Sequence, residues 1–147
     1  MGATPGCYVD TCLLVSLFLQ DEGYAAAEHW LAGSAADALW ISHWVLLEFA
    51  GAVGLRLRRG DLEPRRAEAI HGELEEFRRD RLALLEPTGD DFLRARGWLL
   101  GDPSTGLRSG DALHLALASR SALPLVSADQ RLVQAAGQLG IPARLVI

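Results

Sequence analysis

Four acidic residues at the edges of apolar segments are the side chains of this sequence best suited to chemistry. Asp10 and Asp129 each follow a short apolar stretch, Asp111 opens an apolar run, and Glu48 lies among apolar residues. A buried carboxylate needs hydrogen bonds, an opposite charge or a proton. Four carboxylates held close together would repel one another by several kcal/mol, and a divalent cation removes that repulsion. Because all the donors are oxygens, we expect Mg²⁺ or Mn²⁺ rather than Zn²⁺.

Glu48 is especially informative because its own helix offers no charge to neutralise it. The helix expected at 43–59 has Trp44 and Leu47 on the face that includes Glu48, and its opposite face is apolar as well. The first arginine downstream is Arg56, two turns away. We therefore expect Glu48 to be shielded from water and to meet a positive charge from elsewhere in the chain.

Each acid also has an explanation that involves no chemistry. Asp10, Asp111 and Asp129 could each cap the start of a helix, and Glu48 could take up a proton or pair with a distant arginine. His114 lies one turn after Asp111, and we expect it to be packed or hydrogen-bonded rather than to bind metal. The joint pattern of four acids favours a metal centre over four separate coincidences.

Alternating strands and helices predict an α/β fold that would bring these acids together. Strands are expected at 7–10, 38–42, 82–86, 124–127 and 143–147. Helices are expected at 11–20, 24–33, 43–59, 64–79, 88–101, 109–120 and 128–139. This order predicts a three-layer α/β/α sandwich with a mainly parallel central sheet of about five strands. Ligands of such sheets gather at the carboxyl ends of the strands, where Asp10 and Asp129 lie.

Length and composition predict one globular domain over residues 1–147, because half of the residues are hydrophobic. No apolar run approaches the roughly 18–20 residues that span a bilayer, and the first ten residues lack the pattern of a secretion signal. We expect a cytoplasmic protein. Cys7 and Cys12 have no metal-binding spacing, so we expect reduced packing residues. Thr88 and Asp91 have the spacing of a helix capping box.

The basic residues narrow the classes of function. The net charge is −5 and all 14 basic residues are arginine. Without lysine, a phosphate loop ending in Gly-Lys and Schiff-base chemistry are excluded. Receiver domains and haloacid-dehalogenase-like phosphatases, which also place an Asp after a first strand, rely on lysine and are excluded too. The arginine clusters could be solvated helix faces or phosphate contacts, and we expect the four tryptophans to be core or interface anchors.

The four acidic segments together resemble the PIN-domain ribonucleases, and specifically the VapC-like toxins of bacterial toxin–antitoxin pairs. The segments that carry the resemblance are, in chain order, "YVDTCLLVSLFLQDEG", "ISHWVLLEFAGAVGLRLRRGDL", "LRSGDALHLALA" and "LPLVSADQRLVQAAGQLGI". They cover nearly the whole chain. Four motifs in the expected order and at the expected separations make a specific signal.

The resemblance implies a metal-dependent endoribonuclease that hydrolyses RNA phosphodiester bonds with one or two Mg²⁺ or Mn²⁺ ions. Its catalytic and metal-binding quartet would be Asp10, Glu48, Asp111 and Asp129. The hydroxyls that orient the site would be those of Thr11 and Ser127. The implied partners are an RNA substrate, a cognate antitoxin and a second copy in a homodimer. Two alternatives stay open: a catalytically silent PIN-like module that binds RNA or protein, and a nuclease that acts on DNA, because carboxylate-bound metal reads phosphate and not sugar.

Overall fold

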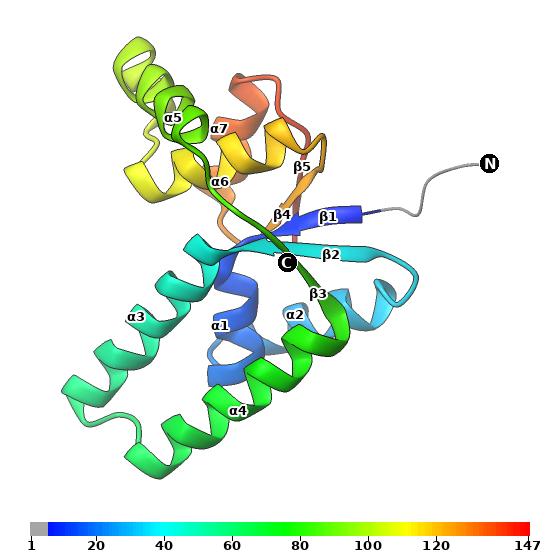
Figure 1. The fold of residues 1–147 in the computed structure, drawn as a ribbon, viewed down its shortest axis with the longest axis vertical. Helices are drawn as coiled ribbons and strands as arrows, with labels where there is room; N and C mark the ends of the chain where they lie inside the picture. The colour runs from blue at the N-terminus through cyan, green and yellow to red at the C-terminus, as the bar shows by residue number, and fades with distance from the viewer. Residues whose placement is uncertain (1–5) are drawn as a thin grey trace.

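The computed structural model describes residues 6–147, and its centre is a five-stranded sheet in which every neighbouring pair of strands is parallel (Figure 1). The strands are β1 (Gly6–Val9), β2 (Ala38–Ser42), β3 (Leu82–Leu85), β4 (Leu125–Ser127) and β5 (Ala143–Leu145). Their order across the sheet is β3-β2-β1-β4-β5. Residues 1–5 of the domain predicted at 1–147 lie outside the described residues.

Helices cover both faces of this sheet, so the predicted three-layer α/β/α architecture is confirmed. The helices are α1 (Thr11–Leu19), α2 (Tyr24–Gly33), α3 (His43–Arg59), α4 (Pro64–Arg81), α5 (Gly89–Gly101), α6 (Ser109–Arg120) and α7 (Gln130–Gln138), with the short 3₁₀ helix η1 (Pro103–Thr105). In Figure 1, α1 to α4 lie on one side of the sheet and α5 to α7 on the other. Among the described residues, no helix is both long and apolar enough to cross a membrane.

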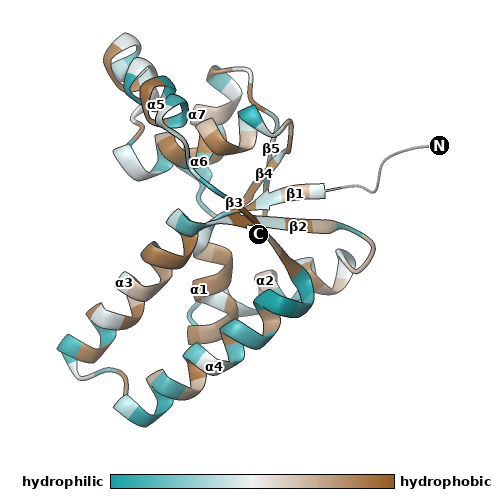
Figure 2. Ribbon diagram, viewed as in Figure 1, coloured by the Kyte–Doolittle hydropathy of each residue, from teal (hydrophilic) through white to brown (hydrophobic). Residues whose placement is uncertain are grey.

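The core lies against both faces of the sheet, as the continuous apolar strands require. Tyr8, Ile41 and Leu125 are fully buried strand residues. The helix α6 is buried over seven consecutive residues, 112–118, because it lies between the sheet and α5. Figure 2 shows the contrast between α1, which is hydrophobic over most of its length, and α4, which carries many hydrophilic residues. The apolar character of α1 fits its burial in the core, and the hydrophilic residues of α4 lie on its solvent-exposed surface.

The expectation that Glu48 is shielded from water on an apolar helix holds only in part. Only Val45 and Phe49 are buried in this helix, and Leu47 is 63% exposed. In Figure 1, α3 starts at the end of β2 and runs away from the sheet, so α1 and α4 cover only part of its surface. Glu48 consequently lies at the boundary between core and solvent, with its side chain 31% exposed.

The predicted capping box at the start of α5 is confirmed. The backbone N–H of Thr88 donates to Asp91 Oδ2 at 2.8 Å, and the backbone N–H of Asp91 donates to Thr88 Oγ1 at 3.4 Å. Arg120 Nε on α6 donates to Asp91 Oδ1 at 2.8 Å, which ties α5 to α6. Burial acts to raise the pKa of Asp91, but the hydrogen bonds from Arg120 and Thr88 outweigh it and hold that pKa below its ordinary value.

The strand order reverses at β1, and this reversal locates the candidate site. From β1 the chain passes to β2 and β3 on one side, and β4 and β5 occupy the other side. The loops leaving the carboxyl ends of β1 and β4 therefore diverge and leave a crevice, which is where parallel sheets bind ligands. Asp10 directly follows β1, and Asp129 lies two residues beyond β4.

Candidate active site

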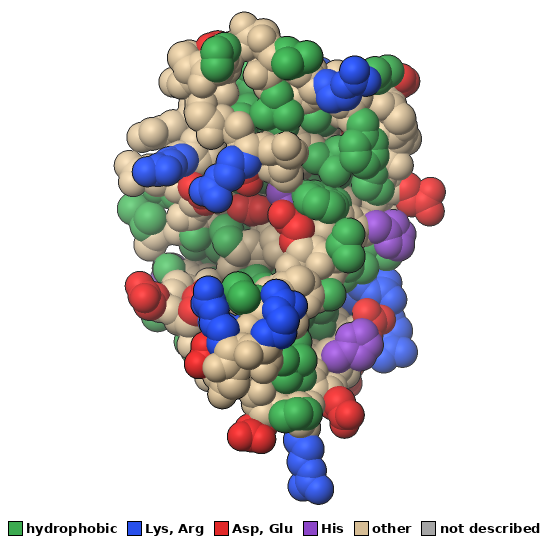
Figure 3. All heavy atoms as spheres, turned by 90° about the vertical axis from the view of Figure 1, so that its left-hand side faces the viewer, with side chains coloured by type: hydrophobic (Ala, Val, Ile, Leu, Met, Phe, Trp, Pro, Cys, Tyr) green, Lys and Arg blue, Asp and Glu red, His purple; other side chains and the backbone are tan. Residues whose placement is uncertain are grey.

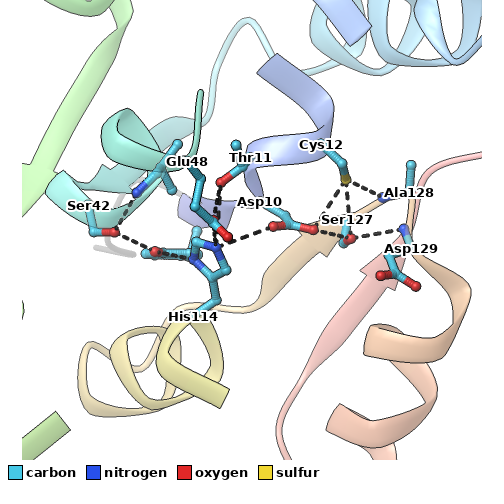
Figure 4. Close-up of polar contacts among 11 residues, drawn as sticks. Asp10, Thr11, Cys12, Ser42, Glu48, His114, Ser127, Ala128 and Asp129 are labelled. Carbon is cyan, nitrogen blue, oxygen red and sulfur yellow. Dashed lines mark hydrogen bonds and ion pairs between the residues drawn. The ribbon is translucent and has the colours of Figure 1, made fainter. Parts of the chain in front are cut away.

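Asp10 is held in place by hydrogen bonds that cross from β1 to β4. It is buried, with 6% of its surface exposed, and Ser127 Oγ donates to its Oδ2 at 2.6 Å (Figure 4). Ser127 Oγ in turn accepts from the backbone N–H of Asp129 at 2.9 Å. Although Asp10 occupies the N-cap position of α1, its side chain makes no capping hydrogen bond. The carboxylate is therefore free of a helix-capping role.

Cys12 is a further contact of Asp10 that the sequence did not reveal. Its Sγ donates to Asp10 Oδ2 at 3.2 Å and lies 3.5 Å from Ser127 Oγ. Burial and the charge of Asp10 raise the pKa of Cys12 to about 12, so the group remains a thiol. Both predicted packing cysteines, Cys7 and Cys12, are free thiols in the structure. Cys12 additionally serves as a hydrogen-bond donor to the site.

Glu48 meets a histidine rather than an arginine. Its Oε1 accepts from Thr11 Oγ1 at 2.7 Å and is hydrogen-bonded to His114 Nε2, which also lies 3.6 Å from Asp10 Oδ1. Burial acts to raise the pKa of Glu48, but the contacts with His114 and Thr11 outweigh it and lower that pKa below its ordinary value. Glu48 is therefore ionised at neutral pH. His114 is 1% exposed and hydrogen-bonded, as predicted.

Gly110 leaves room for the second oxygen of Glu48. A Cβ atom at position 110 would lie 3.1 Å from Glu48 Oε2 and 3.3 Å from Trp44 Cζ2, which is tighter than ordinary van der Waals contact. Any larger residue at 110 would displace the carboxylate or the indole. This role could not be predicted from the sequence, because a glycine in the first turn of a helix has many ordinary explanations.

Asp111 is electrostatically coupled to two of the other acids. It is the third residue of α6, whose N-cap residue is Arg108, and no side-chain capping bond closes that helix. Burial raises the pKa of Asp111 above its ordinary value, and the charges of Asp10 and Asp129 raise it further. Asp10 and Asp129 therefore lie close enough to Asp111 to destabilise its charged form.

Asp129 has a capping role as well as a place in the site. Its Oδ1 accepts from the backbone N–H groups of Arg131 and Leu132 at 3.0 and 3.3 Å, at the start of α7. The capping explanation considered for three of the acids therefore holds for Asp129 alone. Its second oxygen makes no hydrogen bond with the described residues and remains available to a ligand.

The acids border one groove on the surface. A cavity of about 330 Å³ is lined by Glu48, Asp111 and Asp129 together with Trp44, Arg108 and Gly110. A second cavity of about 590 Å³ shares Glu48 and Asp129 with it and continues past Thr11. Figure 3 shows acidic side chains gathered in a hollow near the middle of this face, with arginine side chains above and below them. A phosphate-bearing ligand would meet both kinds of charge there.

The oxygen donors of the site fit a hard divalent cation, although the carboxylates are not yet arranged around a single point as the ligands of a bound ion are. Among residues 6–147, no three His, Cys, Asp or Glu side chains already surround a point where an ion could sit. Burial and the negative charges of Asp10 and Asp129 nevertheless raise the pKa of Asp111, and a bound cation would reduce that repulsion. Asp10 and Asp111 could hold such an ion, with Glu48 and Asp129 completing an oxygen-only set.

Comparison with known proteins bears out the family. A family model for the PIN domain matches residues 7–138. The chain belongs to the PIN domain family. No curated protein sequence matches the chain significantly.

Solved structures share this PIN fold at low sequence identity. VapC20 from Mycobacterium tuberculosis, a toxin that cleaves the sarcin-ricin loop, is 21% identical with a TM-score of 0.67, over 92% of this chain and 95% of that one. VapBC2 from Rickettsia felis, bound to a DNA fragment from its promoter, is 16% identical with a TM-score of 0.64, over 95% and 98%. FitAcB from Neisseria gonorrhoeae is 18% identical with a TM-score of 0.65, over 93% and 95%.

Proposed function

We propose that this PIN domain protein is a metal-dependent endoribonuclease and the toxin of a VapBC-type toxin–antitoxin pair. The observation that carries the proposal is the groove lined by Glu48, Asp111 and Asp129, with Asp10 held beside it by Ser127 at 2.6 Å and lying 3.6 Å from His114. The fold similarity to VapC20, a toxin that cleaves RNA of the sarcin-ricin loop, supports the choice of substrate class.

One or two Mg²⁺ or Mn²⁺ ions would be held by the four carboxylates, with Asp10 and Asp111 as the principal ligands. When bound, such an ion activates a water molecule and neutralises charge at phosphorus and at the leaving oxygen. Ser127 orients Asp10, and Thr11 orients Glu48, through hydrogen bonds of 2.6 and 2.7 Å. These hydroxyls keep two ligand carboxylates from turning away from the groove.

Arginines near the groove would position the RNA strand. Arg108 borders the cavity that contains Asp111 and Asp129, and both Arg108 and Arg131 border the neighbouring cavity. A guanidinium group binds phosphate through two parallel hydrogen bonds, which fixes the strand relative to the carboxylates. Overall the protein is acidic, so this local positive potential would attract the substrate to one face only.

The test is RNA cleavage by the purified protein and by its Asp10→Asn and Asp111→Asn variants, with Mg²⁺ and with a chelator. We expect cleavage by the unsubstituted protein with Mg²⁺, no cleavage with chelator, and a loss of about 100-fold or more in each variant. Cleavage that survives in either variant would contradict the proposal. A parallel digestion of DNA of the same sequence distinguishes a ribonuclease from a DNA-directed enzyme.

If the protein binds RNA but does not cleave it, the alternative of a catalytically silent PIN-like module would hold. Such a module does not need a complete set of acids, whereas here Glu48, Asp111 and Asp129 line the groove and Asp10 lies close enough to influence the charge of Asp111. Gel-shift measurements on the same RNA separate the two cases, because a silent module would bind with unchanged affinity after Asp111→Asn.

The proposed partners are a cognate antitoxin and a second copy of the chain. Large apolar side chains exposed on α3 and α5 support a protein partner, since apolar patches of this kind commonly mark interfaces. They are Leu47, Phe92, Leu93 and Leu100. A small reading frame directly upstream of the coding sequence, whose product inhibits cleavage, would support the antitoxin, and light scattering would measure the oligomeric state. We also propose a cytoplasmic location, where its RNA substrate is found.

A further inference from the structure

We infer that His114 is the positioning residue of the site: Tyr8 and Ser42 lock its imidazole so that Nε2–H holds one oxygen of Glu48 and turns the other toward the groove. The inference rests on the proposed nuclease function for its catalytic consequence. Its structural content is independent of that function, because it concerns the orientation of a ring and a carboxylate.

A buried chain of hydrogen-bonded polar groups from β1, β2 and α6 leads to His114. Tyr8 on β1 has its hydroxyl 2.7 Å from Ser42 Oγ, at the end of β2, and 2.8 Å from His114 Nδ1 on α6. All three residues are 1% exposed or less. Buried polar groups of this kind are retained when they fix a particular arrangement of side chains. Figure 4 shows the chain leading from Ser42 to His114 and on to Glu48.

The protons of this chain can be assigned by counting. His114 Nε2 faces Glu48 Oε1, Asp10 Oδ1 at 3.6 Å and Thr11 Oγ1 at 3.5 Å. Because the Thr11 hydroxyl donates its proton to Glu48, none of the three offers a hydrogen to Nε2, so Nε2 must carry one. Every hydroxyl proton finds an acceptor if Ser42 donates to Tyr8 and Tyr8 donates to His114 Nδ1. Ser42 Oγ also accepts from the backbone N–H of Val45 at 3.3 Å, which leaves its own proton for Tyr8. The chain therefore selects the ring tautomer with hydrogen on Nε2.

Aromatic neighbours keep the ring from turning. The Tyr8 and Trp44 rings lie 5.6 and 6.5 Å from the His114 ring, centroid to centroid, and both are tilted against it. A flip of the imidazole would place a ring carbon against Glu48 and break the bond to Tyr8. Packing and hydrogen bonding thus favour one orientation.

The consequence falls on Glu48. Its Oε1 receives both Thr11 and His114, so it is saturated by the protein, whereas Oε2 lies toward Gly110 at the groove. Without His114, the glutamate would keep only the Thr11 contact and could rotate toward solvent, since its side chain is 31% exposed. His114 therefore presents a single oxygen of Glu48 to the groove, next to Asp111.

Nuclear magnetic resonance on the metal-free protein tests the orientation directly. We expect ¹⁵N shifts at neutral pH that show hydrogen on Nε2 and none on Nδ1 of His114; in Tyr8→Phe the hydrogen should stay on Nε2, and the Nδ1 shift should change because its hydrogen bond from Tyr8 is lost. Hydrogen on Nδ1 alone in the unsubstituted protein would overturn the inference. This readout does not depend on any cleavage activity, so it remains decisive if the proposed function fails.

Two substitutions of the histidine separate positioning from simple structural support. The amide nitrogen of Gln reaches the place of Nε2, whereas that of Asn reaches only the place of Nδ1. We expect His114→Asn to lower Mn²⁺ affinity and kcat by ~10-fold or more with an unchanged KM for RNA, and His114→Gln to restore most of the loss. His29→Asn on the exposed side of α2 is the control and should change neither quantity.

A purely structural role predicts another pattern. Both histidine variants would then show equal losses that follow their melting temperatures, and that result would overturn the inference. If the protein binds Mn²⁺ but cleaves no RNA, the difference in Mn²⁺ affinity between the Gln and Asn variants still decides the matter, while the proposed function fails separately.

Discussion

Replacing Gly110 by alanine should damage the site while leaving the fold intact. The added methyl group would lie 3.1 Å from Glu48 Oε2 and 3.3 Å from Trp44 Cζ2, so these groups must move by a few tenths of an ångström. Against this, alanine is favoured over glycine within a helix by about 0.5–1 kcal/mol. We therefore expect the free energy of unfolding to change by less than about 1 kcal/mol.

The effect on activity should be larger, because a displaced Glu48 no longer meets the geometry that the site requires. Misplacement by about 1 Å can cost 10²-fold in rate, so a shift of a few tenths of an ångström predicts a loss of roughly tenfold in RNA cleavage. The assay is initial cleavage rate at saturating Mg²⁺, paired with urea unfolding of the same preparation.

Gly72→Ala is the matched control. Gly72 lies in the middle of α4, and a Cβ atom there would meet nothing within 4 Å. We expect this variant to be more stable by about 0.5–1 kcal/mol and to cleave RNA at the unsubstituted rate. Equal cleavage rates for the Gly110 and Gly72 variants would refute the reasoning, since position 110 would then impose no constraint on Glu48.

Three further outcomes follow from the charges of the molecule. Burial and the charges of Asp10 and Asp129 raise the pKa of Asp111, so its ionised form lowers the stability of the fold above that raised pKa. Asp111→Asn should therefore raise the melting temperature of the metal-free protein at pH 7, and this gain should vanish below about pH 4. An unchanged melting curve would contradict the coupling. Because the pKa of Asp91 is lowered in the folded protein, its ionised carboxylate stabilises the fold above the ordinary pKa of Asp, and this stabilisation is lost as the pH falls through the lowered pKa. Asp91→Asn should therefore lower the free energy of unfolding by about 1 kcal/mol at pH 7, measured in urea, and leave the cleavage rate unchanged. Mn²⁺ at 100 times its Kd should stabilise the protein by about 2.7 kcal/mol in thermal unfolding, and a similar gain in Asp10→Asn would speak against the ligand role of Asp10.

Local patterns were sufficient to predict the fold and the edge of the sheet where the candidate acids lie. Short apolar strands ending in Asp10 and near Asp129 indicate a parallel sheet with ligands at its carboxyl edge, and the structure has that sheet. Several element ends differ: α7, for example, begins at Gln130 rather than at 128, because Asp129 is its N-cap. The 3₁₀ helix η1 was not predicted, since three residues carry no periodic signal.

Contacts between residues far apart in the chain could not be predicted from the sequence. His114 is 66 positions from Glu48, and only the folding of α6 against β1 and α3 brings the two together. The arginines of α3 lie too far along the helix to neutralise Glu48, and its partner is instead the imidazole of His114 on α6. Cys12 likewise lies 3.5 Å from Ser127, which is 115 positions away and is brought to it only by the pairing of β1 with β4.

The most direct test of the metal centre is diffraction from crystals soaked in Mn²⁺, with data collected at a wavelength where manganese scatters anomalously. We expect an anomalous peak in the groove at roughly 2.1 Å from carboxylate oxygens of both Asp10 and Asp111, a distance usual for small divalent ions. A groove without a peak at saturating Mn²⁺, or peaks that contact neither aspartate, would contradict it.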